Sequence, residues 1–560
     1  MFLHPASTAM QCSVAQVIHS TAKVAAFAFL SSVIFLPMIF RDKSIGVLRA
    51  HAHQVELSLS DVPLEELLEN PERSKISLNR RLAEPEPEPH LVKLRRESVP
   101  VLRLGKIASY KTSYSGLLHV GHPSQEFRVV FDTGSGHLVL PAVECMSESC
   151  QVHRTYNVSA STSSEAINLH GDLVFAGETS DQLSINYGTG TVLGEFVRDT
   201  LCFGVRTVES EDQNKGPRCF SMRMVVAIEM STRPFKDFQF DGILGLGLPA
   251  LSVSSSFSFL HQLALDSPRG EMSFGIFLTE GDAGEESEIA IGGYNKKRLL
   301  EPLTWSPVSG ADLGFWQVEV KAFRIDGVEH EMCMDGTCRA IVDSGTSHLG
   351  IPKMWKDEIE SKLQVDAENL LDCRLAPSPV IEIEVANRNL TLYSSTYMRR
   401  LPLRNGLNVG SVEHTSESTK SSLRSVEVTA EADSANVSRH CSPRLMHVNL
   451  PTMGDKFFVL GETVLHRYYT VFDWGQMRVG FGLAANNWNI GVRSGGERGE
   501  LPHDVEVLLA QTHVEHSVGK RLSGKLALTN GERGESDEDE EDSMAFVQVV
   551  ITLRHRSPAY

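Results

Sequence analysis

The sequence VVFDTGSGHLVLP at residues 129–141 has a counterpart in AIVDSGTSHLGIP at residues 340–352. Each stretch leads through apolar residues to Asp, then Thr or Ser, Gly, and Ser or Thr, and closes with a short apolar strand that ends in Pro. A single Asp-Thr-Gly is ordinary turn chemistry, but two such loops in matched apolar frames indicate an internal duplication. The duplication predicts two similar lobes, each of which contributes one Asp loop.

The two aspartates of these loops, Asp132 and Asp343, are the candidate catalytic pair. Two carboxyl groups held roughly 3 Å apart cannot both ionise, so they share one proton. One can then act as a general base toward water while the other donates a proton to a peptide carbonyl oxygen. The sequence therefore predicts an aspartic endopeptidase that hydrolyses polypeptides with activated water, without a metal ion, a cofactor or a covalent intermediate.

The residues that follow each aspartate suit supporting roles. Glycine lets the two loops approach closely. One hydroxyl of each loop can bond across to the opposite loop, and the other can donate to the outer carboxylate oxygen. The expected support residues are Thr133, Gly134, Ser135, Ser344, Gly345 and Thr346.

The chain from about residue 105 is dense in strand-like patterns. The stretch YSGLLHVGHPSQEFRVVFDTG at residues 114–134 predicts two strands joined by a turn around residues 121–123. Helical patterning is sparse, so the predicted class is all-β. His137, His348 and His466 lie in strand-like segments without metal-ligand spacing, and we expect them to be structural or surface groups.

Four further motifs follow in a fixed order along the chain. They are Tyr187-Gly188-Thr189-Gly190, DGILGLG at 241–247, FFVLGETVL at 457–465 and YYTVFDWGQMRVGFG at 468–482. With these motifs the sequence resembles the pepsin family of aspartic proteases over about residues 105–485. The resemblance implies a monomeric, bilobal double β-barrel with one active-site cleft between the lobes. It also implies a flap in which Tyr187, Gly188 and Thr189 contact the substrate.

Two positions depart from the pattern of that family. Gly136 replaces a Ser, and Val139 replaces the Trp that normally anchors the flap tyrosine. The resulting Ser-Gly-His-Leu variant is similar to aspartic proteases of alveolate protists. A catalytically silent pepsin-like binding module is the alternative function. Such modules typically lack an Asp or the flap tyrosine, whereas this chain retains Asp132, Asp343 and Tyr187.

The chain has nine cysteines, and all except Cys12 occur as near neighbours in the sequence. Eight cysteines allow 105 pairings, so spacing alone leaves the connectivity open. The resemblance implies bridges for Cys145/Cys150, Cys333/Cys338 and Cys373/Cys441, whereas Cys202/Cys219 has no counterpart in pepsin. An even number of cysteines after a membrane-targeting segment favours disulfides and an oxidising compartment.

The 560 residues carry a formal net charge of −18, part of it in SDEDEED at 536–542, which argues against electrostatic binding of nucleic acid. Hydrophobic residues make up 41% of the chain, an ordinary share for a globular protein. The expected organisation is a signal peptide or signal anchor at 1–40, a propeptide or linker at 41–104, an N-terminal lobe at 105–305, a C-terminal lobe at 306–485 with a mobile insertion at 404–438, and a mostly disordered acidic extension at 486–560.

The apolar run at residues 24–40 suits either a cleaved signal peptide or an anchor that attaches the chain to a membrane. Both alternatives predict entry into the secretory pathway. The peptidase would then be secreted, vacuolar or lysosome-like, or membrane-anchored on the lumenal side. Sequons at Asn157, Asn389 and Asn436 are candidate glycosylation sites. The basic segment at 90–106 is either an inhibitory pro-segment or the permanent first strand of the mature body.

Overall fold

The computed structural model describes residues 88–103, 106–187, 190–203, 218–266, 272–280, 284–386, 388–404, 439–450, 453–493 and 548–554. Several sequence predictions lie outside these residues. They concern the apolar run at 24–40, most of the insertion at 404–438, the acidic run at 536–542, Gly188, Thr189 and Asn436. Within the described residues no helix is long and apolar enough to cross a membrane.

The described chain is built mainly of β-strands in two lobes, which confirms the predicted all-β, bilobal class. The strands of the first lobe are β2 (Lys106–Val120), β3 (Gln125–Asp132), β4 (Leu138–Pro141), β5 (Glu165–Ile167), β6 (Gln182–Tyr187), β7 (Gly190–Phe203), β8 (Arg218–Met230) and β9 (Gly242–Gly245). Those of the second lobe are β13 (Gln317–Ile325), β14 (Val328–Glu329), β15 (Arg339–Val342), β16 (Leu349–Pro352), β18 (Ile381–Val385), β19 (Arg388–Leu392), β22 (Leu445–Val448) and β23 (Phe457–Leu460).

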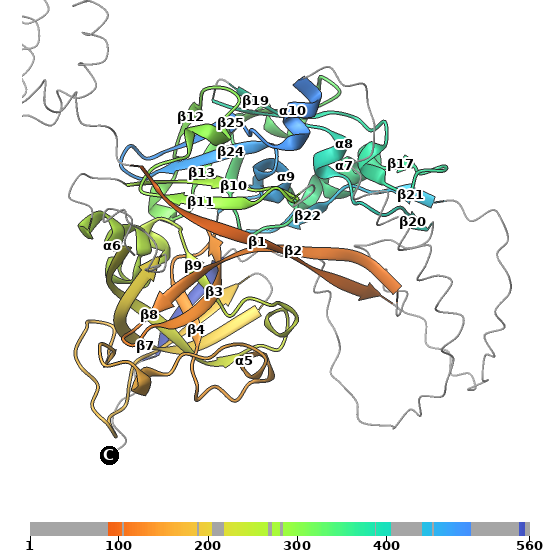
Figure 1. Cartoon of the computed structure of the whole chain (residues 1–560). Coiled ribbons are helices and arrows are strands. Elements are labelled where there is room, and N and C mark those ends of the chain that lie inside the picture. Colours follow the sequence, from red (N-terminus) through yellow and green to blue (C-terminus); the bar gives the residue numbers. More distant parts are fainter. Residues whose placement is uncertain are drawn as a thin grey trace, which may run out of the picture. The chain divides into compact units, whose positions relative to one another are not determined.

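A run of six neighbouring strands, in the order β12-β25-β24-β10-β11-β1, connects the two lobes. Its members are β1 (His90–Arg103), β10 (Ser273–Phe277), β11 (Ser287–Ile291), β12 (Thr304–Pro307), β24 (Tyr468–Asp473) and β25 (Arg478–Leu483). In Figure 1, β1 and β2 run between the strands of the first lobe and those of the second. The first half of β1 pairs with β11 and its second half with β2, so this strand joins the six-strand run to the strands of the first lobe within one 15-stranded sheet.

The remaining elements are small. The described α-helices are α5 (Glu148–Gln151), α6 (Phe259–Asp266), α7 (Lys356–Leu363), α8 (Ser394–Tyr397), α9 (Glu462–Leu465) and α10 (Asn487–Arg493). A 3-stranded sheet contains β17 (Val365–Asp366), β20 (Leu403–Arg404) and β21 (Arg439–Cys441). Both larger sheets have strand orders that end in open edges, so the described strands do not close into strict barrels.

The internal duplication appears in the strand pairing. In the first lobe β3 runs parallel to β9, and β4 runs antiparallel to β9 and parallel to β8. In the second lobe β15 runs parallel to β23, and β16 runs antiparallel to β23 and parallel to β22. The two Asp loops therefore occupy equivalent places in the two lobes. An apolar strand, β9 in the first lobe and β23 in the second, lies beside the strand that leads into each loop.

The same pairing explains the apolar residues that frame each loop. Every residue of β4, β9, β16 and β23 is buried, because each of these strands is covered on both faces. Trp316 joins the lobes from a fully buried position, where its indole N–H donates to the Leu246 carbonyl oxygen at 2.8 Å. The ring of Trp316 also packs edge-on against Phe274 and Phe472.

Among the described residues, four disulfides each join cysteines that are consecutive cysteines in the sequence, with separations of 5, 17, 5 and 68 residues. The pairs are Cys145–Cys150, Cys202–Cys219, Cys333–Cys338 and Cys373–Cys441. The second pair joins directly opposite residues of β7 and β8 at the end of a long hairpin. The fourth spans the chain segment that contains the Ser-rich insertion.

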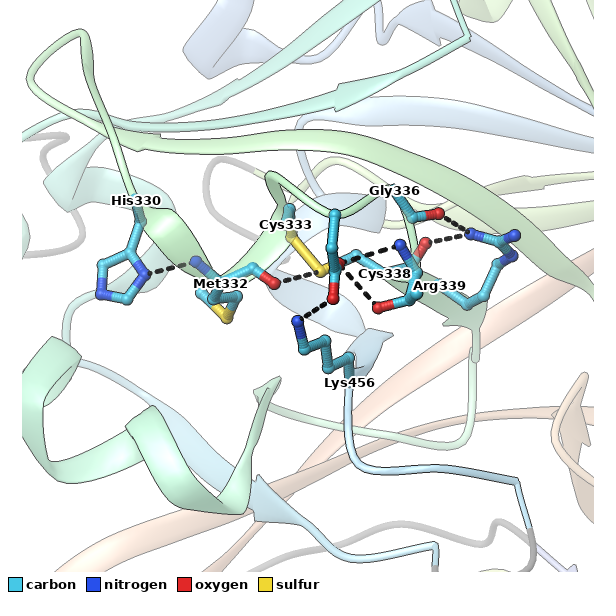
Figure 2. The surroundings of a disulfide bond; sticks show 9 residues. His330, Met332, Cys333, Gly336, Cys338, Arg339 and Lys456 are labelled. Atoms are coloured by element: carbon cyan, nitrogen blue, oxygen red, sulfur yellow. Dashed lines mark hydrogen bonds and ion pairs between the residues drawn. A yellow bond between two sulfur atoms is a disulfide. The ribbon is translucent and has the colours of Figure 1, made fainter.

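The third disulfide closes the loop that leads into the second Asp strand (Figure 2). Arg339, the first residue of β15, donates from Nη1 to the carbonyl oxygens of Gly336 and Cys338. Lys456, which directly precedes β23, forms an ion pair with Asp335 at 2.5 Å. The loop thus ties together the starts of β15 and β23, the two strands that carry the second half of the candidate site.

Two elements lie in the predicted extension at 486–560. Helix α10 begins at Asn487, and a further strand, β26 (Gln548–Arg554), pairs with β6 of the first lobe. Most of the extension lies outside the described residues. The sequence pattern of 544–553 resembles a strand, but no local signal identifies its partner.

Candidate active site

The two candidate catalytic aspartates lie at equivalent strand ends in the two lobes. Asp132 is the last residue of β3, and Asp343 directly follows β15. The Asp132 carbonyl accepts the Leu246 N–H at 2.7 Å, and the Asp343 N–H donates to the Leu460 carbonyl at 3.1 Å. Both aspartates are fully buried, with an exposed fraction of 0%. Each position is therefore fixed by the parallel strand beside it.

Hydrogen bonds between the two Asp loops hold the pair together. The Thr133 N–H donates to Ser344 Oγ at 3.1 Å, and the Ser344 N–H donates to Thr133 Oγ1 at 2.9 Å. Each hydroxyl also donates across the lobes, from Thr133 to the Val342 carbonyl at 2.8 Å and from Ser344 to the Phe131 carbonyl at 2.6 Å. Because all these groups are buried, loss of one partner would leave a polar atom unsatisfied.

Each carboxylate also accepts a matching pair of hydrogen bonds from its own loop. The donor–acceptor distances are 2.5 Å from Ser135 Oγ to Asp132 Oδ2, 2.9 Å from Gly134 N to Asp132 Oδ1, 2.5 Å from Thr346 Oγ1 to Asp343 Oδ2, and 2.8 Å from Gly345 N to Asp343 Oδ1. The hydroxyl and the amide of each loop fix the orientation of its carboxyl group. Because the two loops are equivalent, each carboxyl group is held in the same way by its own loop. The two carboxyls also hydrogen-bond each other.

Burial and mutual proximity shift the titration of the pair. Burial raises the pKa of Asp132 well above its ordinary value, and the charge of Asp343 raises it further. Burial also raises the pKa of Asp343, although the hydrogen bond from Thr346 opposes the shift. The pair therefore retains a shared proton at pH values at which an isolated aspartic acid is ionised.

The glycine of each loop is required by the approach of the opposite carboxyl. A Cβ atom added at Gly134 would lie 2.8 Å from Asp343 Oδ1, and one added at Gly345 would lie 2.4 Å from Asp132 Oδ1. Real Cβ contacts are essentially never this short. Any side chain at either position would push the two carboxyl groups apart.

Tyr187 ends β6 opposite Gly190, next to the tip of the predicted flap hairpin, and is 5% exposed. Burial raises the pKa of Tyr187, and the nearby charge of Asp132 raises it further, which places the phenol close to the candidate pair. Its ring packs edge-on against Phe235, with a centroid distance of 6.1 Å. Val139, which replaces the expected Trp, belongs to the same buried apolar cluster. Gly188 and Thr189 lie outside the described residues.

The absence of a serine at position 136 has a steric cause that the sequence does not reveal. A Cβ atom at Gly136 would lie 2.5 Å from the Leu251 carbonyl carbon, so this segment excludes any side chain there. The Ser252 hydroxyl donates to the Gly136 carbonyl at 2.7 Å. His137 accepts the Val253 N–H at 2.9 Å on Nε2, and it is buried rather than at the surface. His348 is equally buried.

A buried polar cluster, which was not predicted from the sequence, hydrogen-bonds the main chain of the second Asp loop. The Glu462 N–H donates to the Thr346 carbonyl at 2.8 Å. The Glu462 carboxylate accepts the Thr112 hydroxyl at 2.5 Å, and the Ser347 hydroxyl donates to the Thr112 carbonyl at 2.8 Å. Glu462 was identifiable only as the residue that follows the apolar motif at 457–461.

Strand β1 contributes a cation to the same cluster. Arg96 hydrogen-bonds Tyr114, and the charges of Glu462 and Glu280 act on it. The Tyr114 hydroxyl lies 2.5 Å from His466 Nε2. Burial lowers the pKa of His466 to about 3 although Glu280 opposes the shift, so this histidine is a neutral structural group.

The candidate glycosylation sites differ in their surroundings. Asn157 accepts the Ala160 N–H through its side chain at 3.2 Å and is partly buried. Asn389 lies on β19 and is exposed. Asn436 lies outside the described residues, so glycosylation at the three sites stays a prediction.

Comparison with known proteins agrees with this geometry. Residues 113–484 match the family model described as eukaryotic aspartyl protease. Gastricsin from Cavia porcellus is 28% identical over 381 residues, which cover 67% of this chain and 80% of that protein. Pepsin-3 from Oryctolagus cuniculus is 29% identical over 402 residues, covering 71% and 87%. Cathepsin E from Rattus norvegicus is 27% identical over 376 residues, covering 66% and 80%. The chain therefore belongs to the eukaryotic aspartyl protease family.

Proposed function

We propose that this chain is an active aspartic endopeptidase in which Asp132 and Asp343 carry the reaction. The observation that supports it best is the hydrogen-bonded pair of buried carboxyls, each oriented by an amide and a hydroxyl of its own loop. Two carboxyls that share one proton provide a general base and a general acid within the same site.

The pKa of both aspartates is raised by burial, so the pair holds one proton between its two carboxyls. The ionised carboxyl accepts a proton from the attacking water as the water oxygen bonds to the peptide carbonyl carbon. The protonated carboxyl donates its proton to the carbonyl oxygen. Collapse of the tetrahedral intermediate then returns a proton to the leaving amine and breaks the C–N bond.

Tyr187 is the proposed flap residue that covers a polypeptide substrate, together with Gly188 and Thr189. Its buried ring, its contact with Phe235 and its electrostatic proximity to Asp132 support this role. Phe235 packs against the side of Tyr187 in a cluster that also contains Val139, the position where a tryptophan is expected.

We also infer that the chain folds in the secretory pathway, as a lysosome-like or secreted protease made as a precursor. The four disulfides support an oxidising compartment. The precursor reading rests on the basic segment that contains β1, and membrane attachment through residues 24–40 stays part of the proposal.

The test is cleavage of a diverse peptide mixture by purified protein and by two variants, Asp132→Asn and Asp343→Asn. We expect each variant to lose roughly 10²–10⁴-fold or more in kcat/KM, because neither remaining group can make both proton transfers. Asp312→Asn, at an exposed position, is the matched control and should retain full activity. Activity within a few-fold of the unmodified protein in either active-site variant would refute the mechanism.

A second outcome would favour the alternative function. If the unmodified chain binds peptides but cleaves none after acid treatment, it is a silent binding module. Mass spectrometry of the peptide mixture reports cleavage, and retention of peptides on the immobilised Asp343→Asn protein reports binding.

A further inference from the structure

The outer edge of the proposed flap strand is occupied by the C-terminal end of the same chain. Strand β6 pairs with β7 on one side and with β26 on the other. In Figure 1, β26 is the dark blue strand among the strands of the first lobe. The register places Leu553 opposite Leu183, Ile551 opposite Ile185 and Gln548 opposite Tyr187. The added strand therefore reaches the residue at which the described part of the flap strand ends.

The contact involves side chains as well as the main chain. Leu553 packs against the buried cluster that contains Tyr187, Phe235 and Val139. The paired segment, QVVITLR, is rich in β-branched residues, which favour strands. An open strand edge offers unpaired amide and carbonyl groups, and a segment with this pattern satisfies them by strand addition.

The attachment of β26 is suited to be reversible. Residues 494–547 separate it from α10, so the strand reaches β6 as a tethered segment at high effective concentration. The pairing is only seven residues long and lies at the edge of the sheet, where local opening is cheapest.

We propose that β26 is a strap on the flap: the C-terminal segment binds the outer edge of β6, restrains the hairpin that carries Tyr187, and slows turnover of the full chain. This inference rests on the proposed protease function, because it assigns a regulator to the same site. Its physical basis is that a flap must move to admit an extended substrate and release its products. An additional strand on the flap hairpin must detach or move with it.

The experiment uses the full chain and two variants that weaken the strand, Leu553→Asp and Ile551→Pro. Leu553→Asp places a charge against an apolar cluster, and Ile551→Pro removes a backbone donor in the middle of the pairing. Thr552→Asp is the matched control, because it introduces the same charge one position away. Hydrogen–deuterium exchange of the β6 amides is measured in an Asp343→Asn background, and kcat is measured in the active background.

We expect β6 amides to exchange about tenfold faster in both weakening variants than in the control, with a severalfold rise in kcat. Unchanged exchange in both variants would overturn the strap. Faster exchange with unchanged kcat in an active enzyme would also overturn it, because the strap would then not govern turnover. Faster exchange in a chain that cleaves no peptide would count against the protease function, while the attachment of β26 to the flap strand would be supported.

Discussion

Asp132 and Asp343 are held in a site where ionisation is unfavourable, and this affects stability as well as activity. A carboxyl whose pKa is raised by folding binds its proton more tightly in the native state. Its contribution to stability is fully present below the unfolded pKa of about 3.9 and is lost as the pH rises through the folded pKa. The native site is thus destabilised near neutral pH by the groups that we propose for catalysis.

We therefore expect Asp132→Asn to raise the thermal midpoint near pH 7, because the amide carries no charge to bury. The gain should be on the order of 1 kcal/mol, and it should vanish as the pH falls below about 4. Thermal unfolding across a pH series checks this, with Asp312→Asn as a surface control that should show no such trend. An equal difference in midpoint at pH 3 and pH 7 would contradict the proposed ionisation behaviour.

Ser344 bridges the two lobes at the centre of the site. Ser344→Ala should lower stability by about 1–3 kcal/mol, because it leaves the Thr133 N–H without its acceptor in a buried position. It should also lower kcat, since the loops would no longer hold the carboxyl pair. Ser344→Thr keeps the hydroxyl and should restore both properties. Urea unfolding and peptide hydrolysis measure them, and an Ala variant that matches the Thr variant would refute the bridging role.

At the scale of elements, β1 is held in the sheet by a buried cation. Arg96 and Arg95 are adjacent on this strand but face different surroundings. Arg96 faces Tyr114 and Glu462, whereas the Arg95 side chain is 62% exposed and lies 3.4 Å from Glu97. Val92 and Leu94, which lie on the same strand, are buried in the hydrophobic core.

This difference provides a matched pair of variants. Arg96→Ala should destabilise the docking of β1 by on the order of 2 kcal/mol, because it removes a cation that faces buried carboxylates. Arg95→Ala should cost less stability than Arg96→Ala, because the Arg95 side chain is 62% exposed and water screens its interaction with the buried Glu97. Limited proteolysis within β1, combined with urea unfolding, distinguishes the two. Equal sensitivity of both variants would mean that the cluster does not hold the strand.

At the scale of the whole molecule, the same cluster makes the attraction between β1 and the body depend on pH. Burial would raise the pKa of Glu280, but Arg374, His466, Arg444 and Arg96 together lower it to about 2. A depressed carboxyl pKa contributes stability above the unfolded pKa, and this contribution is lost as the pH falls toward 2. Arg96 is the cation that β1 contributes among these groups, so acidification toward pH 2 should weaken the attraction between β1 and the body.

If β1 belongs to a pro-segment, full-length protein should be inactive near neutral pH and should gain activity after an acid pulse. The new N-terminus should lie between residues 81 and 110. N-terminal sequencing before and after the pulse, with activity assayed in parallel, checks this expectation. Full activity of the uncleaved chain at neutral pH would instead identify β1 as a permanent strand of the mature enzyme.

The sequence by itself determined the strand class, the two lobes and the candidate pair. These features depend on local chemistry: an apolar frame buries a strand, a glycine permits a close approach, and a hydroxyl three residues after an aspartate supplies a donor. All of them recur in both loops, so the duplication could be recognised without knowledge of the packing. The roles of Asp132 and Asp343 remain predictions that await the measurements above.

Only the tertiary structure decided which distant groups meet. The segment at Leu251 that excludes a side chain from Gly136, the contact of Phe235 with Tyr187, and the cluster of Glu462, Arg96 and Tyr114 join residues far apart in the chain. The pairing of β26 with β6 depends on which sheet edge the folded body leaves open. A local pattern states that a segment can form a strand or bury a charge, but its partner is fixed only when packing brings the elements together.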